Sequence, residues 1–280
     1  MPELPEVETI KNTLLPKLVG RRIGEVTVTL PRIIKKPAPE EFVSLVVGKE
    51  ILDLSRRGKY LLLHLSERYF LVFHLRMTGR LLYLPAAVPV DKHTHLIFHL
   101  DNGEHLRFHD LRTFGTIYLV QEGELASIRG LASLGPEPLG PQFTPAYLED
   151  ALAGRRIAIK GALLNQELLA GLGNIYVDES LFRAGIHPAR PAGSLTEDEI
   201  SRLHRAIGDV LREGIRYRGT SFRDYVDGEG KAGGFQERLA VYGRGGQPCV
   251  KCGSPLQRVR IAGRGSVFCP CCQPSGSNVD

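Results

Sequence analysis

The sequence Met1-Pro2-Glu3-Leu4-Pro5-Glu6-Val7-Glu8-Thr9 begins the chain, and we expect the rest of the first domain to be organised around it. Apolar residues recur three or four positions apart, which predicts a helix with one buried face: Val7, Ile10, Leu14 and Leu18. Pro5 suits a first helical turn, where a missing N–H group costs no hydrogen bond. Pro16 and Gly20 are expected to end the segment.

The amine in front of this helix is a candidate nucleophile. If Met1 is removed, which a small second residue permits, the chain begins with the secondary amine of Pro2. An α-amino group ordinarily has a pKa of about 7.7–8.0, against about 10.4 for lysine, so far more of it is neutral at pH 7. The positive end of the helix favours the neutral amine further, and the carboxylate of Glu3 can carry protons. This pairing suits Schiff-base chemistry, whereas the plainer alternative is an ordinary helix start.

Composition limits the class of protein. The 280 residues are 42% hydrophobic, which is typical of a globular chain of one or two domains. The start is acidic and polar and no apolar run reaches about 18 residues, so we expect no signal peptide, no membrane partner and a cytoplasmic location. A net charge of +5 and a pI of about 9.0 are compatible with nucleic acid as the partner.

Between about residues 22 and 120 the hydrophobic period is two, which predicts strands. Asp101-Asn102-Gly103 is a hairpin turn signal between two of them. The expected strands are 23–30, 60–65, 69–75, 80–84, 96–100, 106–108 and 115–120. Short strands without intervening helices favour an antiparallel sandwich or barrel. The fold class is therefore multi-domain α+β, with an antiparallel β-sandwich and an N-terminal helix in residues 1–132.

A Gly- and Pro-rich linker at 133–143 separates this domain from a helical one at 144–240. Helices are expected at about 145–153, 161–170, 174–184 and 196–216. The turn Gly171-Leu172-Gly173-Asn174 joins two of them, and it suits either a phosphate contact or a plain helical hairpin. The glycine-rich residues 219–235 are expected to form a long loop, which in a compact domain is usually either a functional lid or disordered.

All five cysteines lie in the last segment, 241–280. The spacing Cys249-x2-Cys252-x16-Cys269-x2-Cys272 predicts one structural zinc ion per chain, held by four thiolates. Cys271 could replace Cys272, although the two-residue spacing favours Cys272. Residues 258–268 between the two cysteine pairs are expected to form a hairpin with Gly263-Arg264-Gly265 at its tip.

Several motifs in this order resemble the bacterial formamidopyrimidine-DNA glycosylases, which remove oxidised purines from DNA. They are Met1–Thr9, Arg56-Arg57-Gly58-Lys59-Tyr60, His74-Leu75-Arg76-Met77, Leu111-Arg112-Thr113-Phe114-Gly115 and the paired cysteines. The resemblance implies a helix-two-turns-helix domain, a zinc finger and a monomeric bifunctional glycosylase and abasic-site lyase. Its substrate would be double-stranded DNA carrying 8-oxoguanine or a formamidopyrimidine opposite cytosine, cut by β,δ-elimination.

The resemblance also implies roles for single residues. Pro2 would attack the sugar, Glu3 would act as acid and base, Glu6 would support them, and Lys59 would reach the phosphate or lesion. The residues that fill the gap left by the flipped nucleotide would be Met77, Arg112 and Phe114, since an unstacked duplex needs an apolar wedge and the orphaned cytosine needs a donor.

Further DNA contacts are expected outside the catalytic residues: Lys160, Asn174 and Arg264 at phosphates, Tyr242 at the backbone, and His93. The lesion loop would comprise Thr220, Ser221, Phe222, Arg223, Asp224 and Tyr225. We assign Thr78 no role. The histidines His93, His95, His99, His105 and His109 are interpreted as ordinary strand residues rather than a metal site.

Two alternatives stay open at this point. One is endonuclease VIII, a sister glycosylase for oxidised pyrimidines that shares the terminal proline and the zinc plan. The other is a non-catalytic zinc-containing DNA-binding protein, which would have no use for a free Pro2 amine.

Overall fold

The computed structural model describes residues 2–222 and 224–275, which form two compact units. The first unit comprises the chain up to Ala132 together with Ile215–Gln236. The second comprises Ser133–Gly214 and the chain from Glu237 onward. The segment Ile215–Gln236 therefore packs with the β-sandwich, whereas the sequence boundaries had placed it in the helical domain. Within the described residues, no helix combines the length and apolarity needed to cross a bilayer.

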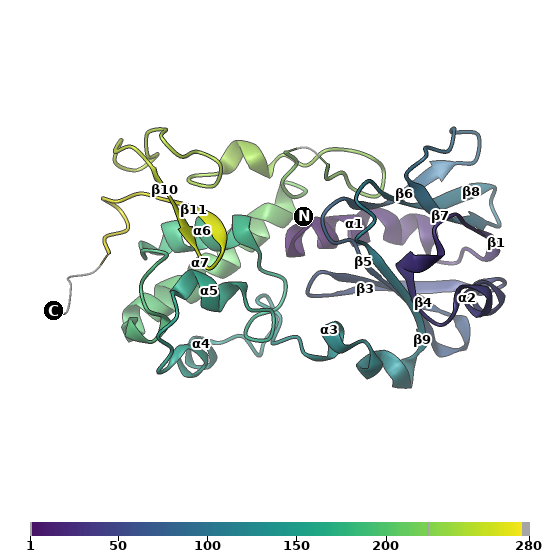
Figure 1. Ribbon diagram of the computed structural model, residues 1–280, viewed down its shortest axis with the longest axis horizontal. Helices are drawn as coiled ribbons and strands as arrows, with labels where there is room; N and C mark the ends of the chain where they lie inside the picture. The colour runs from purple at the N-terminus through teal and green to yellow at the C-terminus, as the bar shows by residue number, and fades with distance from the viewer. Residues whose placement is uncertain (1, 223, 276–280) are drawn as a thin grey trace. The chain divides into compact units, whose positions relative to one another are not determined.

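Helix α1 (Leu4–Leu18) forms as predicted, with Pro5 in its first turn. Its apolar face is buried through Val7, Ile10, Leu14 and Leu18. Pro16 lies inside the last turn instead of ending the helix, which runs two residues further. The helix contacts β3 and β4 of one sheet and β6 of the other (Figure 1), so it closes the core of this unit.

Two sheets form the sandwich, with strand orders β1-β7-β8-β6 and β2-β9-β5-β4-β3. Their strands are β1 (Ile23–Val28), β2 (Ile34–Lys36), β3 (Ile51–Arg57), β4 (Tyr60–Leu65), β5 (Tyr69–His74), β6 (Gly79–Pro85), β7 (Thr94–Leu100), β8 (Glu104–Asp110) and β9 (Thr116–Gln121). The ring of Phe73 in one sheet lies 6.2 Å from Phe98 and 6.0 Å from Phe108 in the other, centroid to centroid. The sandwich is confirmed, with one departure: β2 pairs with β9 in parallel.

The elements of this unit that were not predicted include β2, β3 and helix α2 (Pro39–Val46). Strand β3 carries Asp53, Ser55, Arg56 and Arg57, and a bulge near its start breaks the alternation of buried and exposed positions. Helix α2 has Pro39 at its start and Glu40 and Glu41 in its first turn. These are ordinary helix-start signals that the sequence analysis overlooked.

The second unit holds α4 (Pro145–Leu152), α5 (Ile159–Leu164), α6 (Asn174–Ala184) and α7 (Glu197–Arg216), while the short α3 (Arg129–Ala132) belongs to the first. A capping box starts α7, because Thr196 N donates to Glu199 and Glu199 N donates to Thr196. Helix α5 ends at Leu164, earlier than predicted. Asn165 and Gln166 organise the two turns that follow: Asn165 O accepts from Leu169 N, and Gln166 Oε1 accepts from Gly171 N.

The C-terminal hairpin consists of β10 (Gln257–Ile261) and β11 (Arg264–Phe268). Its turn is Ala262–Gly263, with φ of 49° and 73°. The predicted tip was therefore wrong, because the turn lies earlier in the chain and Arg264 and Gly265 are part of β11.

Candidate functional site

Pro2 lies buried directly before α1, and Glu3 is the residue at the helix N-terminus. Both oxygens of Glu6 accept backbone N–H groups: Oε2 from Glu3 at 2.7 Å and Oε1 from Thr220 at 2.8 Å. Glu6 is only 1% exposed. The structure thus brings Glu3, Glu6 and the start of the predicted lesion loop together around the helix N-terminus, where the backbone dipoles create positive potential.

Lys59 follows Gly58, whose φ of 55° makes the tight turn between β3 and β4. The strand register pairs Tyr60 with His74, and their rings meet edge to face at 4.5 Å. Burial, and then the charges of Arg76 and Lys59, lower the pKa of His74 to about 3. No role was predicted for His74, because its position beside Lys59 follows only from the strand register.

The three predicted wedge residues lie in two loops of the first unit. Met77 is 40% exposed and Phe114 is 51% exposed, which is unusual for large apolar side chains. The guanidinium carbon of Arg112 lies 4.8 Å from the centre of the Phe114 ring, a cation–π arrangement. The next residue after Met77, Thr78, donates to Asp110 Oδ1 at 2.5 Å and accepts from Arg112 N at 3.0 Å. Thr78 therefore has structural partners in this site, and Asp110 was missed.

The predicted lesion loop separates into docked and exposed residues. Tyr225 belongs to the hydrophobic core, and its hydroxyl donates to Arg218 O at 3.1 Å. Burial raises the pKa of Tyr225 strongly. Ser221 Oγ donates to Tyr225 O and accepts from Gly233 N, so it braces the loop. Phe222 is 55% exposed. Arg223 lies outside the described residues, and Asp224 reaches only within 3.9 Å of Arg80. Tyr225 is thus a core residue and not part of an exposed lesion surface.

The histidines of the sheets have ordinary local partners. His95 bonds to Asp110 O at 2.9 Å, His99 to Thr27 at 2.8 Å and His109 to Asp91 at 3.1 Å, while the His105 ring lies 4.3 Å from that of His99. His93 O accepts from Asp110 N at 2.9 Å, which places His93 beside the wedge loops. Its contact with DNA stays a prediction.

In the second unit, Lys160 occupies a different place from the one predicted. It is fully buried, and its ammonium donates to Asp178 at 2.7 Å and to Gly265 O at 2.9 Å. The same carboxylate accepts from Ser266 Oγ and Val267 N. Lys160 therefore ties β11 to α6 from inside, and a direct phosphate contact is replaced by a supporting role.

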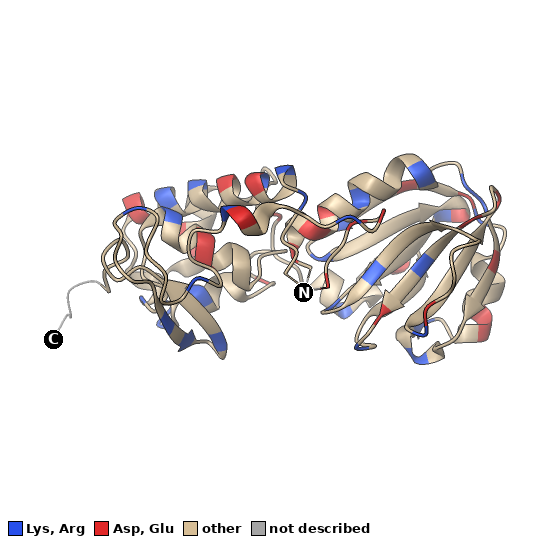
Figure 2. Cartoon of the chain, turned by 90° about the horizontal axis from the view of Figure 1, so that it is seen from above, with Lys and Arg blue, Asp and Glu red and all other residues tan. Residues whose placement is uncertain are grey.

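The other predicted phosphate contacts line one pocket of about 540 Å³, which includes Asn174, Tyr242, Arg258 and Arg264. Asn174 begins α6 and donates to Gly265 O at 3.0 Å. The adjacent Glu179 is buried and accepts N–H groups from Ala240, Val241 and Tyr242 at 2.8–2.9 Å. Figure 2 shows basic residues along the hairpin β10–β11. A helix N-terminus and exposed guanidinium groups at one pocket suit a phosphate.

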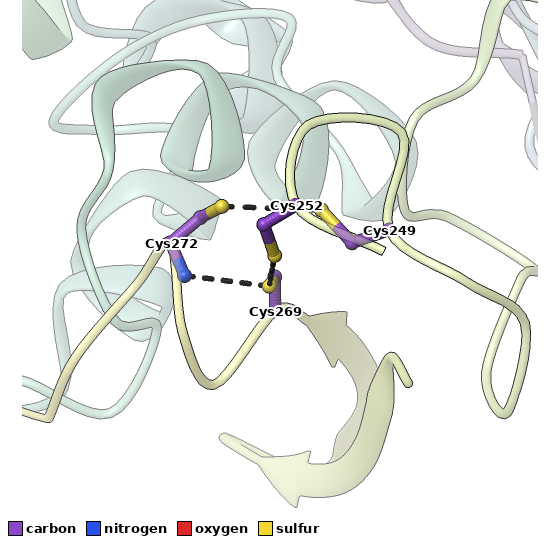
Figure 3. A group of neighbouring side chains, drawn as sticks. All are labelled: Cys249, Cys252, Cys269 and Cys272. Carbon is purple, nitrogen blue, oxygen red and sulfur yellow. Dashed lines mark hydrogen bonds between the residues drawn. The ribbon is translucent and has the colours of Figure 1, made fainter. Parts of the chain in front are cut away.

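The four cysteines of the two pairs converge in the second unit (Figure 3). All their sulfur atoms lie within 4.8 Å of one another, with Cys249 and Cys272 at 3.9 Å and Cys252 and Cys269 at 3.4 Å. Four thiolates 2.3 Å from a tetrahedral zinc ion would lie about 3.8 Å apart, so the set fits zinc. Cys271 is exposed and outside the group, which resolves the choice in favour of Cys272.

Comparison with family models matches three consecutive regions of the chain. They are the "Formamidopyrimidine-DNA glycosylase N-terminal domain" over residues 1–117, the "Formamidopyrimidine-DNA glycosylase H2TH domain" over 134–226 and the "Zinc finger found in FPG and IleRS" over 246–274. The chain belongs to the formamidopyrimidine-DNA glycosylase family. With the zinc finger of this family matched over the four cysteines, the structural zinc site is confirmed.

Relatives of this family align along nearly the whole chain. The chain is 52% identical to the formamidopyrimidine-DNA glycosylase of Desulforamulus reducens, covering 98% of this chain and 99% of that protein, and 56% identical to that of Moorella thermoacetica, covering 93% and 95%. Among solved structures, a mutant of the Lactococcus lactis FPG protein, in complex with Fapy-dG-containing DNA, matches with a TM-score of 0.92 at 38% identity. The match covers 98% of this chain and 100% of that one. The Thermus thermophilus protein matches at 0.89 and 42%, over 98% and 100%.

Proposed function

We propose that the amine of Pro2 is the covalent nucleophile of this chain. As a member of its family the chain is a DNA glycosylase of base excision repair with abasic-site lyase activity. The Pro2 nitrogen attacks C1′ of the damaged nucleotide, the N-glycosidic bond breaks, and the base leaves with the proton that the amine loses. Glu3 then protonates the ring oxygen as the C1′–O4′ bond opens, which gives the Schiff base. Loss of a C2′ proton releases the 3′ phosphate by β-elimination, and δ-elimination releases the 5′ phosphate. Water frees the amine.

The observation that carries this proposal is the position of Pro2 at the start of α1. Pro2 is buried at the positive end of a 15-residue helix, and Glu3 is the next residue. Positive potential disfavours a protonated amine, so more of the amine is available as a nucleophile at neutral pH. Glu6 holds the backbone of Glu3 through its N–H group, which limits how far the carboxylate can move.

The substrate we propose is double-stranded DNA with an oxidised purine opposite cytosine. Solved relatives are complexes with Fapy-dG DNA and abasic-site DNA. Arg112 is the donor for the orphaned cytosine, while Met77 and Phe114 fill the stack. The curated relatives carry the name of the purine enzyme, which favours it over the pyrimidine-lesion alternative.

The pocket of Asn174, Tyr242 and Arg264 is the proposed site for DNA phosphates. The active form we propose is a monomer. We propose that the protein works at the nucleoid, because its DNA substrate lies there.

Borohydride reduction tests the nucleophile. The protein is incubated with a duplex carrying 8-oxoguanine opposite cytosine, reduced, and mapped by peptide mass. We expect the adduct on Pro2, and we expect none when Met1 is retained, because an amide nitrogen cannot form a Schiff base. Pro5→Ala is the matched control, since it alters the first helical turn and keeps the amine. An adduct on Lys59 with Pro2 unmodified would overturn the mechanism.

A further inference from the structure

Two loops of the first unit carry the exposed apolar and cationic side chains described above. Residues 75–78 connect β5 to β6 and present Met77. Residues 111–115 connect β8 to β9 and present Arg112 and Phe114. Each loop contains a non-glycine residue in the left-handed region, Arg76 at φ 56° and Thr113 at φ 55°. Such conformations are unfavourable for these residues and persist where surrounding contacts impose them.

Asp110 supplies contacts that hold the backbone of these two loops. Its side chain is completely buried, and its carboxylate accepts three hydrogen bonds: from Thr78 Oγ1 at 2.5 Å, Arg112 N at 3.2 Å and Gly115 N at 2.8 Å. Its own backbone is held by His93 and His95. The three donors fix the position of this carboxylate, because a buried charge that loses a hydrogen bond raises the free energy of the folded state.

Glycine packing leaves both loops little room to adjust. A Cβ atom on Gly79 would lie 2.4 Å from Leu75 O, which closes the first loop tightly. A Cβ atom on Gly115 would lie 2.4 Å from the Phe108 ring and 3.1 Å from Asp110 Oδ2. The backbone of each loop therefore packs closely against its neighbours. The hydroxyl of Thr78 donates to the carboxylate of Asp110 and so joins the two loops, and Arg112 N donates to both side chains.

We propose that Thr78 and Asp110 are positioning residues that link the two loops and set the distance between Met77 and the Arg112–Phe114 pair. The link makes the loops enter the duplex as one unit, so that Arg112 reaches the orphaned base at a fixed depth. The pair thereby determines how strongly cytosine is preferred opposite the lesion. This inference rests on the proposed wedge role of Met77, Arg112 and Phe114.

The test uses Thr78→Val, which keeps the shape of the side chain and removes its hydroxyl, with Thr78→Ser as the conservative variant. The preference is the ratio of kcat/KM for 8-oxoguanine opposite cytosine to that opposite adenine. We expect Thr78→Val to lower this ratio roughly tenfold, the scale of one hydrogen bond to a charged group, and Thr78→Ser to restore it. Fluorescence of 2-aminopurine next to the lesion should report less unstacking in Thr78→Val.

Thr27→Val is the matched control, because it removes a hydroxyl that bonds to another side chain, His99, within the same sheet. Arg112→Ala distinguishes a failure of the linking role of Thr78 and Asp110 from a failure of the wedge role. If Arg112→Ala lowers the preference and Thr78→Val does not, the linking role of Thr78 and Asp110 is wrong while the proposed function stands. If neither variant lowers it, the wedge role fails, and the inference fails with it.

Discussion

His74 lies at the end of β5 and is 8% exposed, beside the positive charges of Lys59 and Arg76. Arg76 N donates to its Nδ1 at 3.1 Å, so the neutral ring carries its proton on Nε2. Burial and the two cations lower its pKa to about 3, whereas histidine in an unfolded chain titrates near 6.5. The folded protein therefore keeps the ring neutral under conditions in which the unfolded chain takes up a proton.

This difference in pKa predicts that the first unit loses stability as the pH becomes acidic. Stability from neutral His74 is fully present above about pH 6.5 and is lost as the pH falls towards 3, at up to about 1.4 kcal/mol per pH unit. His74→Asn keeps an acceptor for Arg76 N and removes the titration, so its free energy of unfolding should fall less between about pH 6.5 and about pH 4.5. Denaturant melts at several pH values measure this. Equal slopes for the two proteins would contradict the prediction.

Helix α6 presents two adjacent buried carboxylates to two different segments. Asp178 accepts from Lys160 and from Ser266 and Val267 of β11, and Glu179 accepts from the N–H groups of residues 240–242. Burial raises the pKa of both groups above their ordinary values, opposed by these partners. One helix thus places the hairpin that carries Arg264 and the segment that carries Tyr242, which together line the proposed phosphate pocket.

Removing the ammonium from this arrangement should be costly. Lys160→Met leaves Asp178 buried without its cation, and we expect the second unit to lose about 3–5 kcal/mol of stability. The double variant Lys160→Met/Asp178→Asn should recover part of the loss, because the uncompensated charge is gone. Chemical denaturation, together with hydrogen exchange in α6 and β11, measures the loss in the single variant and the recovery in the double variant. A single variant as stable as the wild type would show that the ion pair does not hold the hairpin.

At the scale of the whole molecule, the two units have separate cores. The first is a sandwich completed by α1 and by residues 215–236. Among the described residues, the zinc finger packs on a small cluster that includes Phe182, Val241 and Leu256. A core of that size gives little stability by itself, while zinc bound by thiolates contributes roughly 10–16 kcal/mol in small finger domains. The finger should therefore depend on its metal and the sandwich should not.

Cys249→Ser tests this division. The variant should lose zinc, lose hydrogen-exchange protection in β10 and β11, and bind DNA more weakly, while peptides of the first unit stay protected. The slope of log affinity against log salt should fall by about one for each phosphate that the variant no longer binds. Cys271→Ser is the matched control, because Cys271 lies outside the sulfur group. An active, zinc-free Cys249→Ser protein would contradict a structural role for the metal.

Local patterns in the sequence were sufficient for most elements. Period and spacing predicted α1, seven strands of the sandwich, the end of α6 and the four zinc ligands, because these depend on residues close together in the chain. The missed strand β3 carries polar residues and a bulge that hide its alternation. The Asn165 and Gln166 turns shortened α5 by side-chain bonds that periodicity does not encode.

The sequence by itself determined the family, the order of the domains and the four zinc ligands, and it predicted Pro2 and Glu3 as candidate catalytic residues. The tertiary structure alone decided which residues support them. Thr78 meets Asp110 across 32 residues, Lys160 meets Gly265 across 105 and Glu6 meets Thr220 across 214. A buried charge or N–H group must find a partner wherever the folded chain supplies one, and that partner has no fixed spacing in the sequence.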